Sequence, residues 1–262
     1  PVVMEDSARL QAEDVKQKQK RHAREGRDSP RPPRPLYTPD DAQAAAKRFD
    51  PVAFDTPTEI APGISAIFRE AGHILGAASV QFTIQDDGAP RKVVFSGDLG
   101  RWGRPILRDP SPPAEADVLV VESTYGDRVH EETSDVESLL GELVTSVSRQ
   151  GGNLLIPTFA IERAQDVLYH LSHLRRAKRI PPLMVFLDSP MAIEMTKIFR
   201  RYTGLMDVEM QHGPSPFDFE GLKLTSTRDE SKAINQIRGT SVILAGSGMC
   251  TGGRIKHHLR HN

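Results

Sequence analysis

Three polar residues, each beside glycine and each just past an apolar run, are the residues of this sequence best suited to chemistry. His73 follows ISAIF within GHILG, Asp98 follows KVVF within SGDLG, and Glu122 follows DVLVV within ESTYG. Imidazole and carboxylate groups bind zinc and transfer protons. Because strands are rigid supports from which distant residues converge, the three are predicted to form part of a metal site at a sheet edge.

The apolar runs before these residues are predicted to be short buried strands, since they are rich in β-branched residues and bounded by turn signals. The predicted strands are Ile64–Phe68, Ser79–Ile84, Lys92–Phe95 and Val118–Val121. The sequence DDG at 86–88 indicates a hairpin between the second and third. Residues from about 52 to 121 therefore form a predicted sheet layer.

After Gly126 the apolar spacing changes to that of helices alternating with strands. Helices are predicted with apolar residues at 136–147 and 161–174, and a further helix runs through Phe199. Strands are predicted at 153–157, 183–187 and 241–245. Alternation of this kind indicates a parallel sheet in an α/β unit.

The N-terminal 51 residues have a different character. Residues 1–26 favour a helix whose second half is basic, a pattern most typical of a solvated face. The proline-rich stretch 28–37 must be a loop. Thr38 is predicted to cap a short helix that has Pro39 at its first position and Asp41 three residues after the cap.

Composition sets limits on the function. The 262 residues carry a formal net charge of −1, so binding of nucleic acid would need a local basic patch. A single cysteine, Cys250, excludes an internal disulfide and favours a reducing, cytoplasmic location. No apolar run approaches the roughly 20 residues of a membrane span, so no membrane partner is expected.

Six segments, in order, resemble motifs of the β-CASP branch of the metallo-β-lactamase superfamily, which includes RNA-processing nucleases. They are AGHILGAA (71–78), FSGDLGR (95–101), ESTYG (122–126), IPTFAIERAQ (156–165), DSPMA (188–192) and GSGMCTGG (246–253). The resemblance implies an α/β protein with a partial αββα metallo-β-lactamase sandwich at residues 1–130. An inserted β-CASP domain, also partial, would occupy residues 131–262. It also implies two zinc ions, with His73 as a ligand, Asp98 as the bridging carboxylate, and Glu122 as a catalytic acidic residue near the scissile phosphate.

The chain also departs from the family pattern. The His-x-His-x-Asp-His cluster of the family is absent and is expected before Pro1, and two later family histidines are expected after Asn262. His257, His258 and His261 come too early to fill those roles. The chain is therefore expected to be a fragment that lacks a full active site.

Less specific interpretations of the three residues stay open. Asp98 could simply cap a turn, as Ser-Gly-Asp sequences often do. His73 could be a loop histidine, and Glu122 could pair with Arg128 or cap the following turn.

A substrate-binding surface is predicted in the second half of the chain. Glycines let backbone N–H groups approach phosphate, and a helix start adds a favourable dipole. The predicted contacts are Ser247, Gly248, Thr251 and Gly252, with Arg163 beside them. Arginines and a lysine at 175–179 would widen a basic track, although a plain strand-to-helix turn and a solvated face are the alternatives.

The favoured function is zinc-dependent cleavage of phosphodiester bonds in single-stranded RNA, with a homodimer as one possible assembly. Two metals would activate the water and neutralise the phosphoryl oxygens. One alternative is a non-catalytic RNA-binding relative, and another is a hydrolase of small esters or thioesters. The inserted α/β domain argues against small substrates, because a second domain over the site suits a polymer.

Overall fold

The structure is a computed structural model that describes residues 1–27, 31–85, 88–129 and 135–261. It divides into two compact units, Pro1–Pro51 and Val52–Asn262, which are considered separately. None of the described helices combines the length and the apolar character that crossing a membrane requires.

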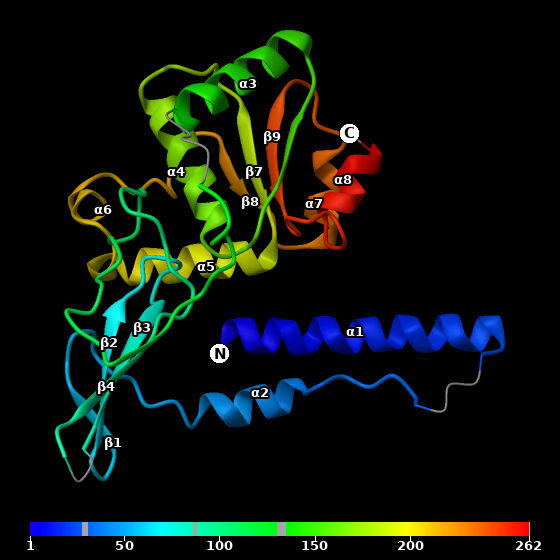
Figure 1. Cartoon of the computed structure of the whole chain (residues 1–262). Coiled ribbons are helices and arrows are strands. Elements are labelled where there is room, and N and C mark those ends of the chain that lie inside the picture. Colours follow the sequence, from blue (N-terminus) through cyan, green and yellow to red (C-terminus); the bar gives the residue numbers. More distant parts are fainter. Residues whose placement is uncertain (28–30, 86–87, 130–134, 262) are drawn as a thin grey trace. The chain divides into compact units, whose positions relative to one another are not determined.

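The first unit contains two helices, α1 (Val2–Glu25) and α2 (Pro39–Ala46) (Figure 1). Helix α1 ends at Gly26, which takes the left-handed conformation with a φ of 62°. The predicted cap of α2 is confirmed, because Thr38 and Asp41 form a reciprocal capping box and Pro39 is the first helical residue.

The second unit begins with a five-stranded sheet in the order β1-β2-β3-β4-β5. Its strands are β1 (Thr58–Ala61), β2 (Ile64–Glu70), β3 (Ala78–Ile84), β4 (Arg91–Phe95) and β5 (Val118–Val120). The four predicted strands are present, and β1 is an addition that pairs with β2. Residues 86 and 87 of the predicted hairpin turn lie outside the described residues, but β3 and β4 pair antiparallel as a hairpin requires.

The directions of the strands bring His73, Asp98 and Glu122 to the same edge of the first sheet. The β2–β3 and β3–β4 pairs are antiparallel and the β4–β5 pair is parallel, so β2, β4 and β5 all run the same way. Their carboxyl ends therefore lie at one edge of the sheet. His73, Asp98 and Glu122 each come two or three residues after one of these ends.

The prediction that β5 is buried is wrong. Val118, Leu119 and Val120 are 52%, 56% and 49% exposed. Strand β5 is the last strand in the sheet order and, within the described part of the chain, pairs with β4 alone, so its side chains lack the neighbours of a central strand.

A second sheet has the order β6-β9-β7-β8, and all three of its strand pairs are parallel, as predicted. Its strands are β6 (Leu154–Pro157), β7 (Met184–Asp188), β8 (Leu222–Leu224) and β9 (Ser241–Ala245). The three-residue β8 was not predicted.

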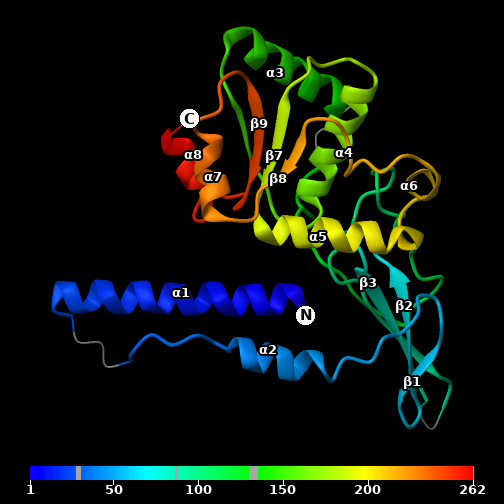
Figure 2. The same ribbon diagram turned by 180° about the vertical axis from the view of Figure 1, so that it is seen from behind.

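Helices cover both faces of this second sheet (Figure 2). One face carries α3 (Val136–Gln150) and α4 (Arg163–Arg176), and the other carries α7 (Arg228–Ile234) and α8 (Ile255–His261). The remaining helical elements are α5 (Pro190–Arg201), η1 (Thr203–Leu205) and α6 (Val208–His212).

The two faces have separate cores, which explains why β9 is buried along its whole length. Val242 and Leu244 pack into the large core, together with leucines of α4. Ile243 points the opposite way and joins Phe186 and Ile234. This alternation on a strand covered on both sides is the burial pattern expected of a parallel sheet.

Candidate metal centre and substrate surface

His73 and Asp98 approach each other across the loops that follow β2 and β4. His73 Nε2 lies 3.9 Å from Asp98 Oδ2, and the side chains are 44% and 75% exposed. The backbone holds the loops together, because the N–H of Gly100 donates to the carbonyl oxygen of Ala71 at 2.8 Å. Two of the predicted site residues are thus side by side and accessible to a substrate.

Glu122 holds the Asp98 loop from the end of β5. Its Oε1 accepts a hydrogen bond from the backbone N–H of Leu99 at 3.0 Å, and its Oε2 accepts one from Thr124 at 3.3 Å. The bond from Leu99, those from Thr124 and the nearby His73 imidazole together lower the pKa of Glu122. Glu122 therefore caps the following turn and also fixes the residue next to Asp98.

The alternative in which Glu122 pairs with Arg128 is not what the structure shows. Arg128 Nε is instead 3.1 Å from the carboxylate of its neighbour Asp127.

The donor types of His73 and Asp98 fit zinc, which takes imidazole nitrogen and carboxylate oxygen. Protein sites for zinc use three or four such ligands. Among the described residues, no group of three or more His, Cys, Asp or Glu side chains is arranged to hold a metal. The chain thus presents two suitable donors side by side, and their role as ligands stays a prediction.

The glycine-rich loop 246–253 follows β9 at the carboxyl edge of the parallel sheet, the edge where open α/β sheets bind ligands. The N–H groups of Ser247 and Cys250 donate to carbonyl oxygens of the loop itself, and Ile255 N donates to Gly246 O at 3.0 Å. These three N–H groups are therefore used internally. Helix α8 has seven described residues, so the expected contribution of its dipole is small.

The four predicted contact residues in this loop have different surroundings. Ser247 Oγ is buried and has no hydrogen-bond partner among the described residues. Gly248 lies against the ring of Phe159, where a Cβ would be 3.0 Å from ring carbons. Thr251 is exposed and Gly252 is half-buried.

Arg163 begins α4, just after the loop that follows β6, the strand paired with β9. Its side chain is 58% exposed, and its guanidinium lies 3.5 Å from Asp166. It remains available to a substrate at the same sheet edge as the glycine-rich loop.

The predicted wider basic track is largely occupied by the protein itself. Arg176 donates to three backbone carbonyls, at residues 214, 215 and 218. Arg179 binds Glu137 at 2.8 Å and also Ser138. These arginines hold the fold together rather than forming a free surface.

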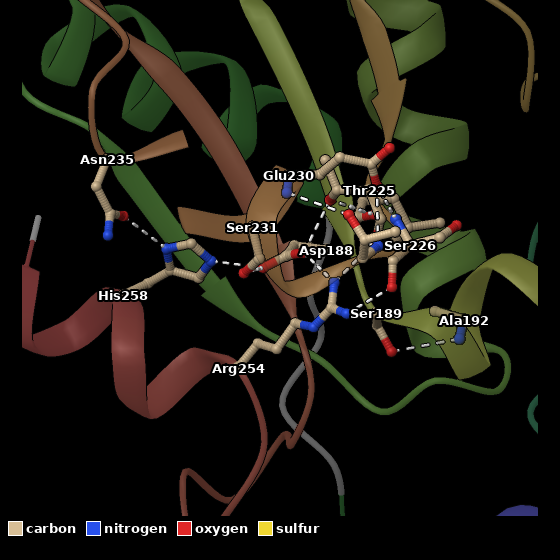
Figure 3. Close-up of polar contacts among 12 residues, drawn as sticks. Asp188, Ser189, Ala192, Thr225, Ser226, Glu230, Ser231, Asn235, Arg254 and His258 are labelled. Carbon is tan, nitrogen blue, oxygen red and sulfur yellow. Dashed lines mark hydrogen bonds and ion pairs between the residues drawn. The ribbon is translucent and has the colours of Figure 1, made fainter. Parts of the chain in front are cut away.

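A buried polar network around Asp188 was not predicted (Figure 3). Asp188 is fully buried at the end of β7, and its carboxylate binds His258 at 2.7 Å and Arg254 at 2.6 Å. It also accepts hydrogen bonds from Thr225 and Ser231. Burial favours the neutral acid, but the bonds from His258, Ser231, Arg254 and Thr225 outweigh it and lower the pKa of Asp188.

This network has a structural role. The partners of Asp188 come from the end of β8, from α7 and from the start of α8, so one carboxylate joins three segments to the central sheet. His258 is fully buried and is thereby engaged as a structural residue. The sequence singled out Asp188 within the segment DSPMA (188–192), but it did not indicate the partners of Asp188, which are up to 70 residues away in the chain.

Residues 164–262 match the family model of the Beta-Casp domain. These residues therefore form a Beta-Casp domain, in agreement with the α/β fold of this part of the chain.

Comparison with curated proteins gives the same assignment. The chain is 39% identical over 232 residues to ribonuclease TTHA0252 of Thermus thermophilus, covering 87% of this chain and 52% of that protein. It is 30% identical over 223 residues to cleavage and polyadenylation specificity factor 73 of Drosophila melanogaster, covering 83% and 31%. It is 32% identical over 223 residues to transcription termination factor FttA of Methanosarcina mazei, covering 82% and 34%. The chain thus spans between about a third and a half of the length of these relatives.

Proposed function

We propose that the whole protein is a metal-dependent hydrolase that cleaves RNA phosphodiester bonds, and that this chain supplies part of its active site. The observation that carries the proposal is the meeting of His73 and Asp98, 3.9 Å apart, at a sheet edge where Glu122 fixes the Asp98 loop. The similarity to a relative named as a ribonuclease supports the same reaction class.

Within this proposal His73 and Asp98 hold zinc, with two ions expected in the whole protein. Bound zinc would lower the pKa of a water molecule and neutralise the charge on the phosphoryl oxygens. Glu122 keeps its carboxylate ionised through two backbone N–H groups and so holds Leu99, and with it Asp98, in place. A preorganised support of this kind is what a reacting centre requires.

The substrate-binding part of the proposal places RNA along the carboxyl edge of the parallel sheet. The exposed guanidinium of Arg163 would contact a phosphate, and the loop with Ser247, Gly248, Thr251 and Gly252 would lie beside it. A single-stranded form of the RNA, a homodimer and a cytoplasmic location belong to this proposal as predictions from the sequence.

The test uses the intact protein and the variant Asp98→Asn, with Asp127→Asn as a matched control. Asp127 is exposed and pairs only with neighbouring Arg128 among the described residues, so its variant should behave as the wild type. Loss of a ligand should lower RNA cleavage at least about 100-fold and reduce the bound zinc.

Each alternative gives a different result. Undiminished cleavage by Asp98→Asn would overturn the proposal. Tight RNA binding by a zinc-free wild type that does not cleave would favour a non-catalytic RNA-binding protein. Faster hydrolysis of small esters or thioesters than of RNA would show instead that the protein is a hydrolase of small substrates.

A further inference from the structure

Glu162, at the start of α4, has an unusual backbone conformation. Its φ is 65° and its ψ is −59°, and the N–H of Arg163 donates to the carbonyl oxygen of Ile161 at 2.8 Å. This is a γ-turn with positive φ, the rarer and more strained form. Backbone strain of this kind at a residue other than glycine persists where the surrounding structure requires it, and it clusters at functional positions.

The turn directs the Glu162 side chain into a buried site. Glu162 is 5% exposed, and neither of its carboxylate oxygens has a hydrogen-bond partner among the described residues. Asp166, one helical turn further on, is 4% exposed, and its Oδ2 binds Arg104. Asp166 Oδ1 also lacks a partner among the described residues.

The charges of this cluster do not balance if both acids are ionised. Arg104 is the mostly buried cation and is paired with Asp166, whereas Arg163 is largely exposed. If Glu162 were also ionised, its buried negative charge would have no cation of its own among the described residues to balance it, and burying an unpaired charge lowers the stability of the fold. Burial and the charge of Asp166 accordingly raise the pKa of Glu162 to about 8, against the opposing effects of Arg104, the Leu75 N–H and Arg163.

Other titratable groups border the cluster from α3 and α4. His170 faces Asp166 from the next turn of α4, and the attraction of His170 opposes the rise that burial causes in the pKa of Asp166. His170 and His173 each lie 3.9 Å from Glu137 of α3.

The acid pair contacts both loops that carry the predicted zinc ligands. Leu75 lies two residues after His73 and packs against the large core. The backbone N–H of Leu75 is close to the Glu162 carboxylate and lowers the pKa of Glu162, although the two groups do not meet the geometry of a hydrogen bond. Arg104, the partner of Asp166, lies six residues after Asp98. Ionisation of Glu162 would therefore draw on groups belonging to both loops.

We propose that Glu162 and Asp166 form a buried acid pair that positions the loops carrying His73 and Asp98, and that exchange of one proton in the pair adjusts those loops. Glu162 is thus a positioning residue, since it acts on the site through Leu75 and Arg104. The proposal rests on the proposed function only in treating His73 and Asp98 as site residues.

The test follows the backbone amide of Leu75 and the Nε–H of Arg104 by NMR between pH 6 and 9.5, in the metal-free chain. In the wild type both signals should shift with one common midpoint near pH 8. Glu162→Gln cannot ionise and should remove this titration. The control Glu142→Gln, at an exposed position of α3, should keep it.

A second variant separates a positioning role from a merely structural one. Asp166→Asn removes the like charge and frees Arg104 to pair with Glu162. The pH midpoint at which the Leu75 amide signal shifts should therefore fall by at least about one pH unit. If the two wild-type signals lack a common midpoint, or if Glu162→Gln retains it, the proposal is overturned. These readouts need neither zinc nor cleavage, so failure of the proposed function would not be mistaken for failure of the acid pair.

Discussion

Gly100 lies directly against the backbone of Gly72, so that a Cβ on Gly100 would be 1.8 Å from the Gly72 carbonyl oxygen. This contact sets the separation of the His73 and Asp98 loops, and no side chain can fit within it.

Gly100→Ala should therefore force the two loops apart. The overpacking should lower the free energy of unfolding by about 1–3 kcal/mol, measured by urea denaturation. It should also weaken zinc binding by the intact protein. Gly88→Ala is the control, since a Cβ there meets no atom of the described residues within 4 Å. Equal stability and equal zinc content in the two variants would show that the loop contact is unimportant.

The pKa of Glu122 should lie below that of an ordinary glutamate, because the backbone N–H groups of Leu99 and Thr124 stabilise the ionised form. In a pH titration followed by NMR, the Leu99 amide should shift with a midpoint below 4.5. Its stabilising effect is present above the unfolded pKa and is lost as the pH falls through the lowered one. Glu122→Gln should abolish this titration of Leu99, whereas Glu142→Gln should leave it unchanged.

Arg163→Ala should weaken RNA binding by the intact protein to a similar extent for all sequences, because the predicted contact is with phosphate. The slope of log affinity against log salt should decrease in magnitude by about 0.7–1. Arg149→Ala, at an exposed position of α3, should leave the slope unchanged. An unchanged slope for Arg163→Ala would remove this residue from the predicted substrate surface.

The sequence was sufficient to predict the strands that end near His73, Asp98 and Glu122, because β-branched runs followed by glycine are local signals. It was also sufficient to predict that the strands of the second sheet are parallel. The short strands β1 and β8, with four and three residues, are too brief to give a pattern. The exposure of β5 depends on its position at the sheet edge, which is a property of the assembled sheet and not of its apolar sequence.

The polar networks could not be predicted for a related reason. Asp188 is bound by residues between 37 and 70 positions away, so only the fold reveals that its carboxylate is satisfied. Glu162 lies in a recognisable motif, but its burial beside Asp166 depends on a backbone turn that glutamate rarely adopts. Both cases involve tertiary contacts that no local propensity describes.

Asp188→Asn should be strongly destabilising, since it removes the negative partner of half-buried Arg254 and fully buried His258. Breaking a buried charge pair in this way costs about 3–5 kcal/mol, to be measured by urea unfolding at neutral pH. The control is Asp229→Asn. The Asp229 carboxylate is exposed and makes only a weak ion pair with Lys232, at 4.0 Å, so this variant should change the free energy of unfolding by no more than about 0.5 kcal/mol. Because folding lowers the pKa of Asp188, the wild type should lose its greater stability over Asp188→Asn only as the pH falls below 3.8, the pKa of this aspartate in the unfolded chain.

Glu162 should give the chain a pH-dependent stability of the opposite sign. Its pKa is about 8 in the folded state against 4.5 for the free side chain, so between these values the folded chain holds a proton that the unfolded chain has released. Stability relative to Glu162→Gln should therefore be greatest below about pH 4.5 and decline by up to about 1.4 kcal/mol per pH unit until about pH 8. Urea unfolding of the wild type, Glu162→Gln and Glu142→Gln at intervals from pH 5 to 9 measures this difference. Curves for the wild type and Glu162→Gln that run parallel across the whole range would mean that Glu162 is ionised in the fold and that the acid pair does not hold a proton.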